Sequence, residues 1–405
     1  MSFSHVFSVP AYYPNFRCKA GDCRHTCCSG WGITISMKEY FNLLGMDCSP
    51  ELRRRLDTAF HPVETPSEER YATISPRWDG DCPLHLPNGY CGLQCEHGEG
   101  AIPSVCRYYP RSPKTYYAYQ CQCANSCEGV VEQLFAYREP MTFLRHRLTF
   151  TFNETQERRQ DALAQIFPAV QRACLHILQD RSRPLSHRLQ HLGEFVTVMD
   201  IPYRQGNADG VRAVLPLSSV IANGKEPSSL TKANLKSALH ILQDLLHWTE
   251  QNNEPLQDEL KSALEMLCMT SEEAISDETV ALWEQYDQNM KQLFPENERM
   301  LEQLFVNHLC YDSFPFGVNR TNLWDSFLAF ITAYALIRSA SICHMAAYTS
   351  TDAEGCSLTP TEAYADIVAA VFRMVEHTNF AHNAPILARR FAYDTPTKAN
   401  LLCYL

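Results

Sequence analysis

The sequence predicts a mainly α-helical protein, in which a cysteine-rich metal-cluster region of loops and short helices packs on a larger helical body. Two observations predict this arrangement. Of the eighteen cysteines, twelve lie at or before Cys127, and apolar residues take up helical spacing from about Phe143 onward. Because 405 residues exceed one ordinary core, we expect two regions: 1–140, the cysteine-rich iron–sulfur region, and 141–405, the helical body.

The first region is rich in Cys, Pro, Gly and Tyr and has few long periodic stretches. Such a composition buries little apolar surface unaided, so we expect a metal to hold its loops and short helices together. One helix is predicted over residues 36–44, where Ser36 serves as the N-cap and Glu39 completes a capping box.

In the second region, apolar residues recur every three or four positions, as in amphipathic helices. Stretches of this kind begin at Leu163, Leu235, Leu260, Met300 and Ile367. Thr359 and Pro360 predict the N-cap and first residue of the last of these helices. Residues 202–229 contain several Gly and Pro residues and predict an extended linker or an irregular hairpin.

Composition and charge exclude several classes of protein. With 45% hydrophobic and 20% charged residues the chain is globular, and its net charge of -11 argues against binding to nucleic acid or an anionic membrane. The N-terminal residues lack a secretory signal, and the longest apolar run, 327–337, is shorter than the roughly 20 residues that cross a bilayer. We therefore expect a cytoplasmic protein with reduced thiols and a buried helix at 327–337.

Cysteines at short separations can converge on one soft metal because closing the loops between them costs little entropy. Four segments carry them: Phe16-Arg17-Cys18-x4-Cys23-x3-Cys27-Cys28-Ser29-Gly30-Trp31; Asp81-Cys82-Pro83-Leu84 with Gly89-Tyr90-Cys91; Cys106-Arg107-Tyr108-Tyr109-Pro110-Arg111; and Cys121-x-Cys123-x3-Cys127. Zinc sites usually present their thiolates as C-x2-C pairs, and the sequence has none. The irregular spacing therefore favours an iron–sulfur cluster, with zinc as the alternative.

Not every cysteine can bind one cluster, which takes four thiolates. The favoured metal ligands are Cys18, Cys23, Cys27, Cys28, Cys82, Cys91 and Cys106. Because Cys27 and Cys28 are adjacent and point in different directions, we expect only one of them to ligate. Cysteines outside the motifs are interpreted as structural (Cys48, Cys95) or as core residues of helices (Cys174, Cys268, Cys310, Cys343).

These motifs resemble those of the flagellin lysine-N-methylases of flagellated bacteria. The resemblance rests on the first three cysteine segments, more weakly on Ser126-Cys127-Glu128, and on four helical motifs: Phe305-Val306-Asn307-His308, Phe314-Pro315-Phe316, Ala335-Leu336-Ile337-Arg338 and Val375-Glu376-His377. It spans about residues 13–377. It implies transfer of a methyl group from S-adenosylmethionine to lysine side chains of flagellin, by an enzyme that contains a [4Fe-4S]-type cluster.

The methyl donor must be held in an uncommon way, because the sequence has neither a G-x-G-x-x-G motif nor a C-x3-C-x2-C triad. Trp31, Tyr108 and Tyr109 are candidates for an adenine or lysine pocket, or they shield the metal. Arg107 and Arg111 are candidates for binding the donor carboxylate or cluster sulfide, or they form surface ion pairs.

The polar residues His308, Arg338, Glu376 and His377 lie on otherwise apolar helices and need partners there. The sequence identifies no catalytic residue, and it leaves open whether the cluster is catalytic or structural. Two other functions remain: a metal-chelating or electron-transfer protein without methyl transfer, and a methylase acting on another protein. The large helical body argues against the first, because simple carriers are small.

Overall fold

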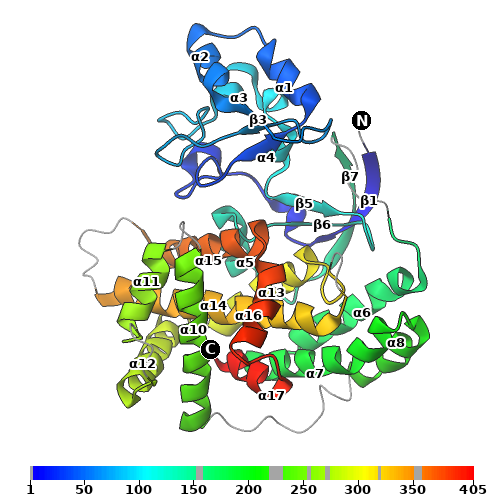
Figure 1. Cartoon of the computed structure of the whole chain (residues 1–405), viewed down its shortest axis with the longest axis vertical. Coiled ribbons are helices and arrows are strands. Elements are labelled where there is room, and N and C mark those ends of the chain that lie inside the picture. The colour runs from blue at the N-terminus through cyan, green and yellow to red at the C-terminus, as the bar shows by residue number, and fades with distance from the viewer. Residues whose placement is uncertain are drawn as a thin grey trace.

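Helices dominate the computed structural model, which describes residues 3–151, 158–218, 231–252, 257–269, 274–317, 321–350 and 358–405. About 60% of the chain is helical and 10% is strand, so the prediction of a mainly α-helical fold is confirmed. Figure 1 shows three parts: a small lobe formed by early elements, a sheet beneath it, and a large helical body that contains the C-terminus.

The small lobe, residues 28–108, is called here the N-terminal lobe. It contains β2 (Ile33–Ile35), α1 (Met37–Leu44), α2 (Pro50–Ala59), β3 (Phe60–Pro62), β4 (Ala72–Ile74), α3 (Gly92–His97) and α4 (Ser104–Tyr108). Its three strands form an antiparallel sheet in the order β2-β4-β3. The lobe has its own small core: Ile35, Leu43, Leu52, Leu56, Ala59, Ala72, Ile74, Leu84 and Leu93. The predicted helix at 36–44 is confirmed as α1, including the Ser36–Glu39 capping box.

A second sheet, which the sequence analysis did not predict, joins the N-terminus to the helical body. It has the order β5-β6-β1-β7 and consists of β1 (Phe3–Pro10), β5 (Arg111–Lys114), β6 (Gln120–Cys123) and β7 (Phe143–Phe150). The strands β1 and β7 pair antiparallel along their full length, from Phe3 opposite Phe150 to Pro10 opposite Phe143. The N-terminal strand is therefore paired with residues that follow the whole cysteine-rich segment.

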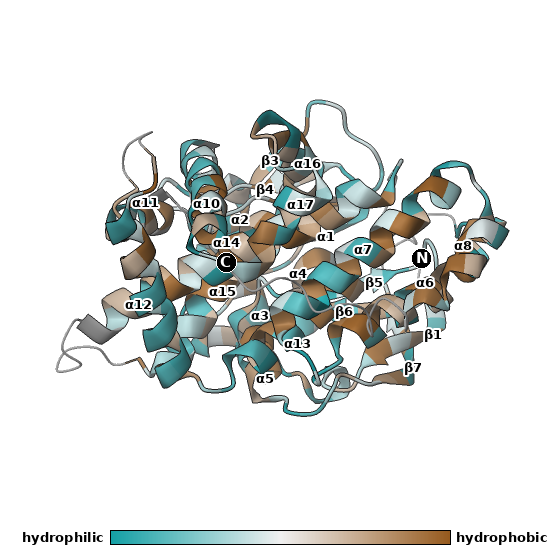
Figure 2. Ribbon diagram, turned by 90° about the horizontal axis from the view of Figure 1, so that it is seen from below, coloured by the Kyte–Doolittle hydropathy of each residue, from teal (hydrophilic) through white to brown (hydrophobic). Residues whose placement is uncertain are grey.

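The helical body contains α5 (Glu128–Ala136), α6 (Ala162–Leu178), α7 (Leu185–Arg204), α8 (Ala208–Val214), α10 (Lys232–Asn252), α11 (Gln257–Met266), α12 (Asp277–Leu293), α13 (Asn297–Tyr311), α14 (Leu323–Ser350), α15 (Pro360–His377), α16 (Phe380–Arg390) and α17 (Pro396–Ala399). Brown and teal residues alternate along helices such as α7 and α10, as expected for amphipathic helices (Figure 2). The predicted start of α15 is confirmed, because Thr359 caps it and forms a capping box with Glu362.

The central helix α14 packs against α7, α11, α15 and α16. Its window Leu323–Tyr348 is long and apolar enough to cross a membrane by length and composition, but 94% of the most apolar stretch is buried inside the protein. Such burial is typical of a core helix, and the predicted buried helix at 327–337 is confirmed as part of α14.

Two predictions about the second region need correction. The first part of the segment 202–229 is not an extended linker, because α7 continues through Pro202 to Arg204 and α8 follows it; residues 219–229 lie outside the described part. Cys268 is not a core residue, because it lies just beyond α11 with a positive φ of 55° and is exposed. Cys174, Cys310 and Cys343 are buried, as predicted.

Candidate functional site

The eight motif cysteines other than Cys121 and Cys123 divide into two neighbouring groups. The junction group consists of Cys18, Cys23, Cys27 and Cys127, and the lobe group of Cys28, Cys82, Cys91 and Cys106. The described cysteines are all free thiols. The seven predicted ligands are thus distributed over both groups, and the eighth thiol, Cys127, is one that the prediction left out.

The junction group surrounds a small cavity of about 20 Å³ where the cysteine-rich segment meets the helical body. Cys18 and Cys23 flank a short 3-10 helix, Ala20–Asp22, and Cys127 directly precedes α5. Phe16, Tyr109 and Ser126 also line the cavity, and Arg373 reaches it from α15. Burial raises the pKa of the Cys127 thiol to about 11 and that of Cys23 to about 12.

The loop that carries Cys23 and Cys27 is fixed to α5 by one carboxylate. Glu128 accepts hydrogen bonds from the backbone N–H groups of Arg24 (3.0 Å) and His25 (2.7 Å) and from Lys19 Nζ (2.7 Å). Burial opposes ionisation of Glu128, but these donors hold its pKa below the usual value. The carboxylate therefore sets the position of the loop relative to α5.

Arg24 extends this attachment to α15. Its guanidinium bonds Asp366 through Nε (2.9 Å) and Nη2 (2.8 Å), and Nη2 also donates to Glu132 (2.6 Å). Burial opposes ionisation of Asp366, but hydrogen bonds from His25 and Arg24 lower its pKa. These charge-assisted bonds hold the cysteine loop, α5 and α15 in one arrangement.

Beside the junction group lies a set of aromatic and polar side chains that we call the junction network: Trp31, Tyr109, Ser126, Glu376 and His377. Ser126 Oγ lies 2.7 Å from His377 Nε2 and 3.1 Å from Tyr109 Oη, and the Ser126 N–H donates to Glu376 Oε2 (3.2 Å). The Trp31 ring centroid lies 5.1 Å from that of His377 and 5.8 Å from that of Tyr109.

The side chains of the network differ in burial. Ser126 is buried and the Glu376 side chain is 0% exposed, whereas Trp31 is partly exposed. His377 as a whole residue is exposed at the end of α15, but its ring packs against those of Trp31 and Tyr109. Among the residues that the structure describes, neither Glu376 Oε1 nor His308 Nδ1 has a hydrogen-bond partner, and the two atoms lie 3.5 Å apart. A buried carboxylate oxygen without a donor is costly unless it serves a ligand or a proton.

The network can bind a cation and accept a proton. Aromatic faces attract a sulfonium or an ammonium group, and the Arg373 guanidinium carbon already lies 5.0 Å from the centre of the Trp31 ring. Desolvation of its ring lowers the pKa of His377, so the imidazole is neutral near pH 7 and able to take a proton. Glu376 offers a second acceptor.

The other predicted cofactor-binding residues lie apart from Trp31. Arg107 donates to the carbonyl oxygens of Glu99, Gly100 and Ile102, so it holds the backbone between α3 and α4. The Tyr108 hydroxyl pairs with Thr151 Oγ1 (2.9 Å).

Arg111 lies over the rings of Tyr13 and Phe16, 5.2 Å from the Phe16 centroid. Phe16 lines the junction cavity, whereas Arg111 does not. Arg338, considered in the sequence analysis, bonds Asp287 and the backbone of Tyr404 instead of any member of the network.

The sequence motifs include Cys127 and Ser126, but neither was a favoured site residue, and Arg373 was not considered. Cys121, Cys123 and Cys127 share one motif, so the sequence alone could not show which of the three belongs to the site. The structure separates them: Cys121 and Cys123 are buried in β6, and the Cys121 thiol donates to Tyr13 Oη (3.4 Å). The signals of Cys127 in the sequence were the fourth cysteine segment and Glu128, which places Cys127 directly before a helix start with an acidic first residue.

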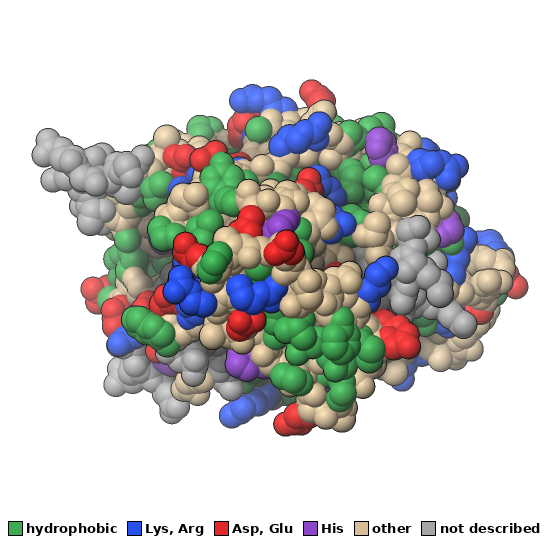
Figure 3. Space-filling view, turned by 90° about the horizontal axis from the view of Figure 1, so that it is seen from above, with side chains coloured by type: hydrophobic (Ala, Val, Ile, Leu, Met, Phe, Trp, Pro, Cys, Tyr) green, Lys and Arg blue, Asp and Glu red, His purple; other side chains and the backbone are tan. Residues whose placement is uncertain are grey.

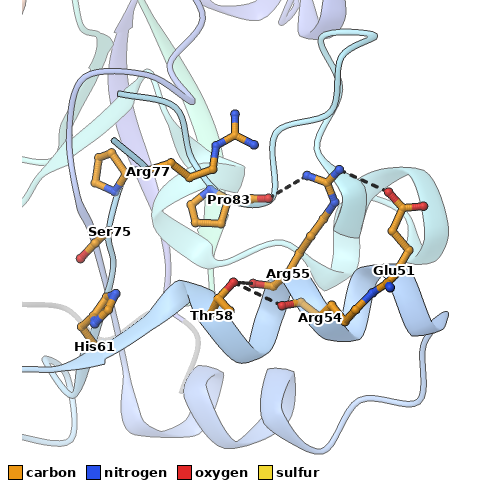
Figure 4. A pocket seen from close by; sticks show the side chains of 9 residues that line it. Glu51, Arg54, Arg55, Thr58, His61, Ser75, Arg77 and Pro83 are labelled. Atoms are coloured by element: carbon orange, nitrogen blue, oxygen red, sulfur yellow. Dashed lines mark hydrogen bonds and ion pairs between the residues drawn. The ribbon is translucent and has the colours of Figure 1, made fainter. Parts of the chain in front are cut away.

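A shallow groove of about 510 Å³ lies on the N-terminal lobe (Figure 4). Its arginines are largely engaged: Arg55 donates to the Pro83 carbonyl (3.1 Å) and to Glu51 (3.3 Å), and Arg77 forms ion pairs with Asp79 and Asp81. The space-filling view from above shows acidic and basic side chains interspersed around a cluster of hydrophobic ones (Figure 3). The groove lacks a convergent set of reactive groups such as that of the junction network.

The donor chemistry of both cysteine groups fits a metal centre, since each supplies four thiols. The thiols do not yet form a coordination shell: among the residues that the structure describes, no three His, Cys, Asp or Glu side chains converge closely enough to hold an ion. Binding a metal would therefore require the thiols of a group to move closer together.

The end of the helical body brings a buried carboxylate and an imidazole against an aromatic, cysteine-lined segment, and such convergence of titratable side chains is typical of an enzyme's active site. The family model of the FliB lysine N-methylase C-terminal domain matches residues 171–384, more than half of the chain. The chain therefore belongs to the flagellin lysine N-methylase family, as the resemblance predicted, and is a protein-lysine methyltransferase. No curated protein and no solved structure matches it.

Proposed function

We propose that this enzyme transfers the methyl group of S-adenosylmethionine to the ε-amino groups of flagellin lysines at the junction network. One observation carries the proposal: the end of α15, inside the region matched by the methylase family, places Glu376 and His377 against Trp31, Tyr109 and Ser126 of the cysteine-rich segment. The substrate follows from the family, whose name refers to flagellin methylation.

The reaction requires that the lysine amine lose its proton and that its nitrogen be positioned against the methyl group. A lysine amine attacks only when neutral, and its usual pKa is about 10.4, so a nearby acceptor must take its proton. We assign this task to His377, with Glu376 behind it. The nitrogen then forms a bond to the methyl carbon while the carbon–sulfur bond breaks, and its electron pair stays on sulfur, leaving S-adenosylhomocysteine.

Trp31 and Tyr109 would present their aromatic faces to the positively charged sulfonium or to the lysine stem. We propose that the junction group holds the [4Fe-4S] cluster implied by the resemblance, because its cavity adjoins Tyr109 and Ser126 of the network. When bound, such a cluster supplies either an electron or a binding position for the amino-acid end of the donor.

The test is transfer of a labelled methyl group to purified flagellin by enzyme isolated without oxygen. We expect label on flagellin lysines, and at least a tenfold slower rate for His377→Gln and Glu376→Gln, within the range typical of proton-transfer residues. Cys95→Ser, which alters an exposed cysteine outside both groups, is the control and should match the unaltered enzyme. Label that appears only on other proteins would exclude flagellin, and full activity of both variants would exclude this site.

A further inference from the structure

The lobe group is a set of four thiols that all lie near one another. The Cys106 thiol interacts electrostatically with those of Cys28, Cys82 and Cys91. The Cys82 thiol interacts with those of Cys28 and Cys91, and the Cys91 thiol with that of Cys28. Every pair in the group is therefore close, although the four residues are spread over almost eighty positions of the sequence.

Backbone hydrogen bonds bring these four positions together. The Cys82 N–H donates to the Cys28 carbonyl (2.7 Å), next to an antiparallel bridge between Ser29 and Asp81. A second bridge pairs His85 with Cys91. Cys91 directly precedes α3, and Cys106 lies on α4. The group is thus assembled from four different segments of the lobe.

The sulfurs of Cys82 and Cys91 each lie at a backbone turn that supplies N–H donors. The backbone N–H groups of Leu84 and His85 donate to the Cys82 sulfur, and those of Leu93 and Gln94 donate to the Cys91 sulfur. Such donors, two and three positions ahead, fix the orientation of each sulfur, as is typical of cysteines that bind a metal. A thiolate is the form that binds a metal.

The apolar core of the N-terminal lobe is small, and part of the lobe has little regular structure. Nine residues form that core, and two of them are alanines. The segment 75–91 that carries Cys82 and Cys91 contains no helix and no strand longer than an isolated bridge. A core of this size supplies little stability, and small domains of this kind are usually completed by a disulfide or a metal. The described cysteines form no disulfide.

The two cysteine groups meet at Cys27 and Cys28, whose thiols contact each other. They nevertheless belong to different parts of the molecule. Cys127 ties the junction group to α5, which packs on α15 of the helical body, whereas all members of the lobe group lie within residues 28–108. Eight thiols also exceed the four that either a zinc ion or a four-iron cluster takes.

We propose that the cysteine-rich region holds two metals and that the lobe group binds one zinc ion, which cross-links the N-terminal lobe separately from the junction group. Four thiolates complete a tetrahedral zinc shell, and such closed shells are typical of structural sites. On binding, the four sulfurs move to about 2.3 Å from the ion and release their protons. This inference concerns the folding of the lobe and does not depend on methyl transfer.

The test is metal analysis of the full chain purified without oxygen. We expect one zinc per chain in addition to iron and acid-labile sulfide. Cys82→Ser and Cys106→Ser should each remove zinc and leave iron, whereas Cys127→Ser should remove iron and leave zinc. Cys95→Ser, in the same lobe but outside both groups, should change neither metal. Iron without zinc in the unaltered chain, or loss of iron from Cys82→Ser with zinc retained, would overturn the assignment.

A second variant covers the case in which a serine substitution prevents folding. Cys91→His replaces one thiolate by imidazole, which also binds zinc, so this chain should retain one zinc. After exchange of zinc for cobalt(II), the unaltered chain should show sulfur-to-cobalt charge-transfer bands, and Cys91→His should shift them to those of a site with three sulfurs and one nitrogen. Identical cobalt spectra for the two chains would overturn the proposed role of Cys91 as a ligand.

Discussion

At the level of single residues, two histidines have pKa values that are shifted in opposite directions: His377 at the end of α15 and His25 on the cysteine loop. Desolvation lowers the pKa of His377, whereas the hydrogen bond to Asp366 raises the pKa of His25 on the facing loop. An unfolded histidine titrates near pH 6.5. Folding therefore favours the neutral form of His377 and the charged form of His25, and these preferences affect stability in opposite directions as the pH falls.

We predict that His377→Gln and His25→Gln change the pH dependence of stability with opposite signs. When the pH falls below about 6.5, unfolded His377 takes up a proton that the folded state resists, so the unaltered enzyme loses stability that His377→Gln retains. The contribution of His25 is fully present below that pH and is lost as the pH rises through its raised pKa, so His25→Gln costs most in acid.

The measurement is urea unfolding of the three proteins at pH 5.5 and 7.5, with the stability difference between the two pH values compared. Because every other titrating group is common to the three chains, it cancels from the comparison. Parallel pH dependence of His377→Gln and the unaltered enzyme would contradict the lowered pKa of His377.

Glu128 is the second residue that merits a test, because it receives two backbone N–H groups of the cysteine loop. We predict that Glu128→Gln, which keeps the shape but loses the charge, weakens this attachment by about 1–3 kcal/mol. Alkylation of Cys23 and Cys27, followed by mass spectrometry, should become faster. Glu51→Gln, on a side chain that is 69% exposed, is the control, and equal rates in both variants would show that Glu128 does not fix the loop.

Sequence spacing named seven of the eight thiols of the two groups as ligands, which stays a prediction, but it could not divide them into groups. That division depends on bridges such as the one between Ser29 and Asp81, which form between positions about fifty residues apart. Spacing also could not show that Arg107 is engaged by three carbonyl oxygens, because these come from a loop whose path is set by tertiary packing.

At the level of elements, several long helices were predictable, whereas the strands and the segment of α7 and α8 were not. The core faces of α6, α10, α13 and α15 follow from apolar spacing alone, and the buried residues agree with it. The strand β1 had a weaker signal, since only Phe7 and Val9 alternate as fully buried residues. The strands β5 and β6 are four residues long and contain a proline or cysteines, which weakens their signal. They pair with each other, but β6 joins the rest of the sheet through β1, which is distant in sequence.

Helix α15 carries two residues of the junction network, and its start has a capping box that can be tested. We predict that Thr359→Ala lowers stability by about 1 kcal/mol, because the N–H group of Glu362 loses its acceptor. Thermal unfolding measures this effect, with Thr359→Ser as the control that keeps a hydroxyl. Ser36→Ala should remove the equivalent cap from α1 in the N-terminal lobe. Equal stability of Thr359→Ala and Thr359→Ser would show that the box contributes nothing.

At the level of the whole molecule, two cores of very different size share one chain. The large core extends from Phe7 in β1 to Leu405 at the C-terminus and includes α13, α14 and α15. The N-terminal lobe has the separate nine-residue core. Residues 17–28 link the two cores, and Arg24 in this segment bonds side chains of α5 and α15. The proposed reaction therefore takes place at the boundary between the large, stable body and the weakly stabilised lobe.

This imbalance predicts that the N-terminal lobe opens before the body unfolds. Opening free energies follow the apolar surface that each part buries, and the lobe buries little. Hydrogen exchange followed by mass spectrometry should show fast exchange in α1 and α2 and slow exchange in α13 and α14. A thiol-compatible chelator should accelerate exchange in the lobe and leave α14 unchanged, because a metal held by the lobe thiols stabilises only the part that it cross-links. Uniform exchange across both parts would mean that the two cores open as one unit. In that case the junction contacts of Arg24 and Glu128 would stabilise the lobe more than the core of the lobe does.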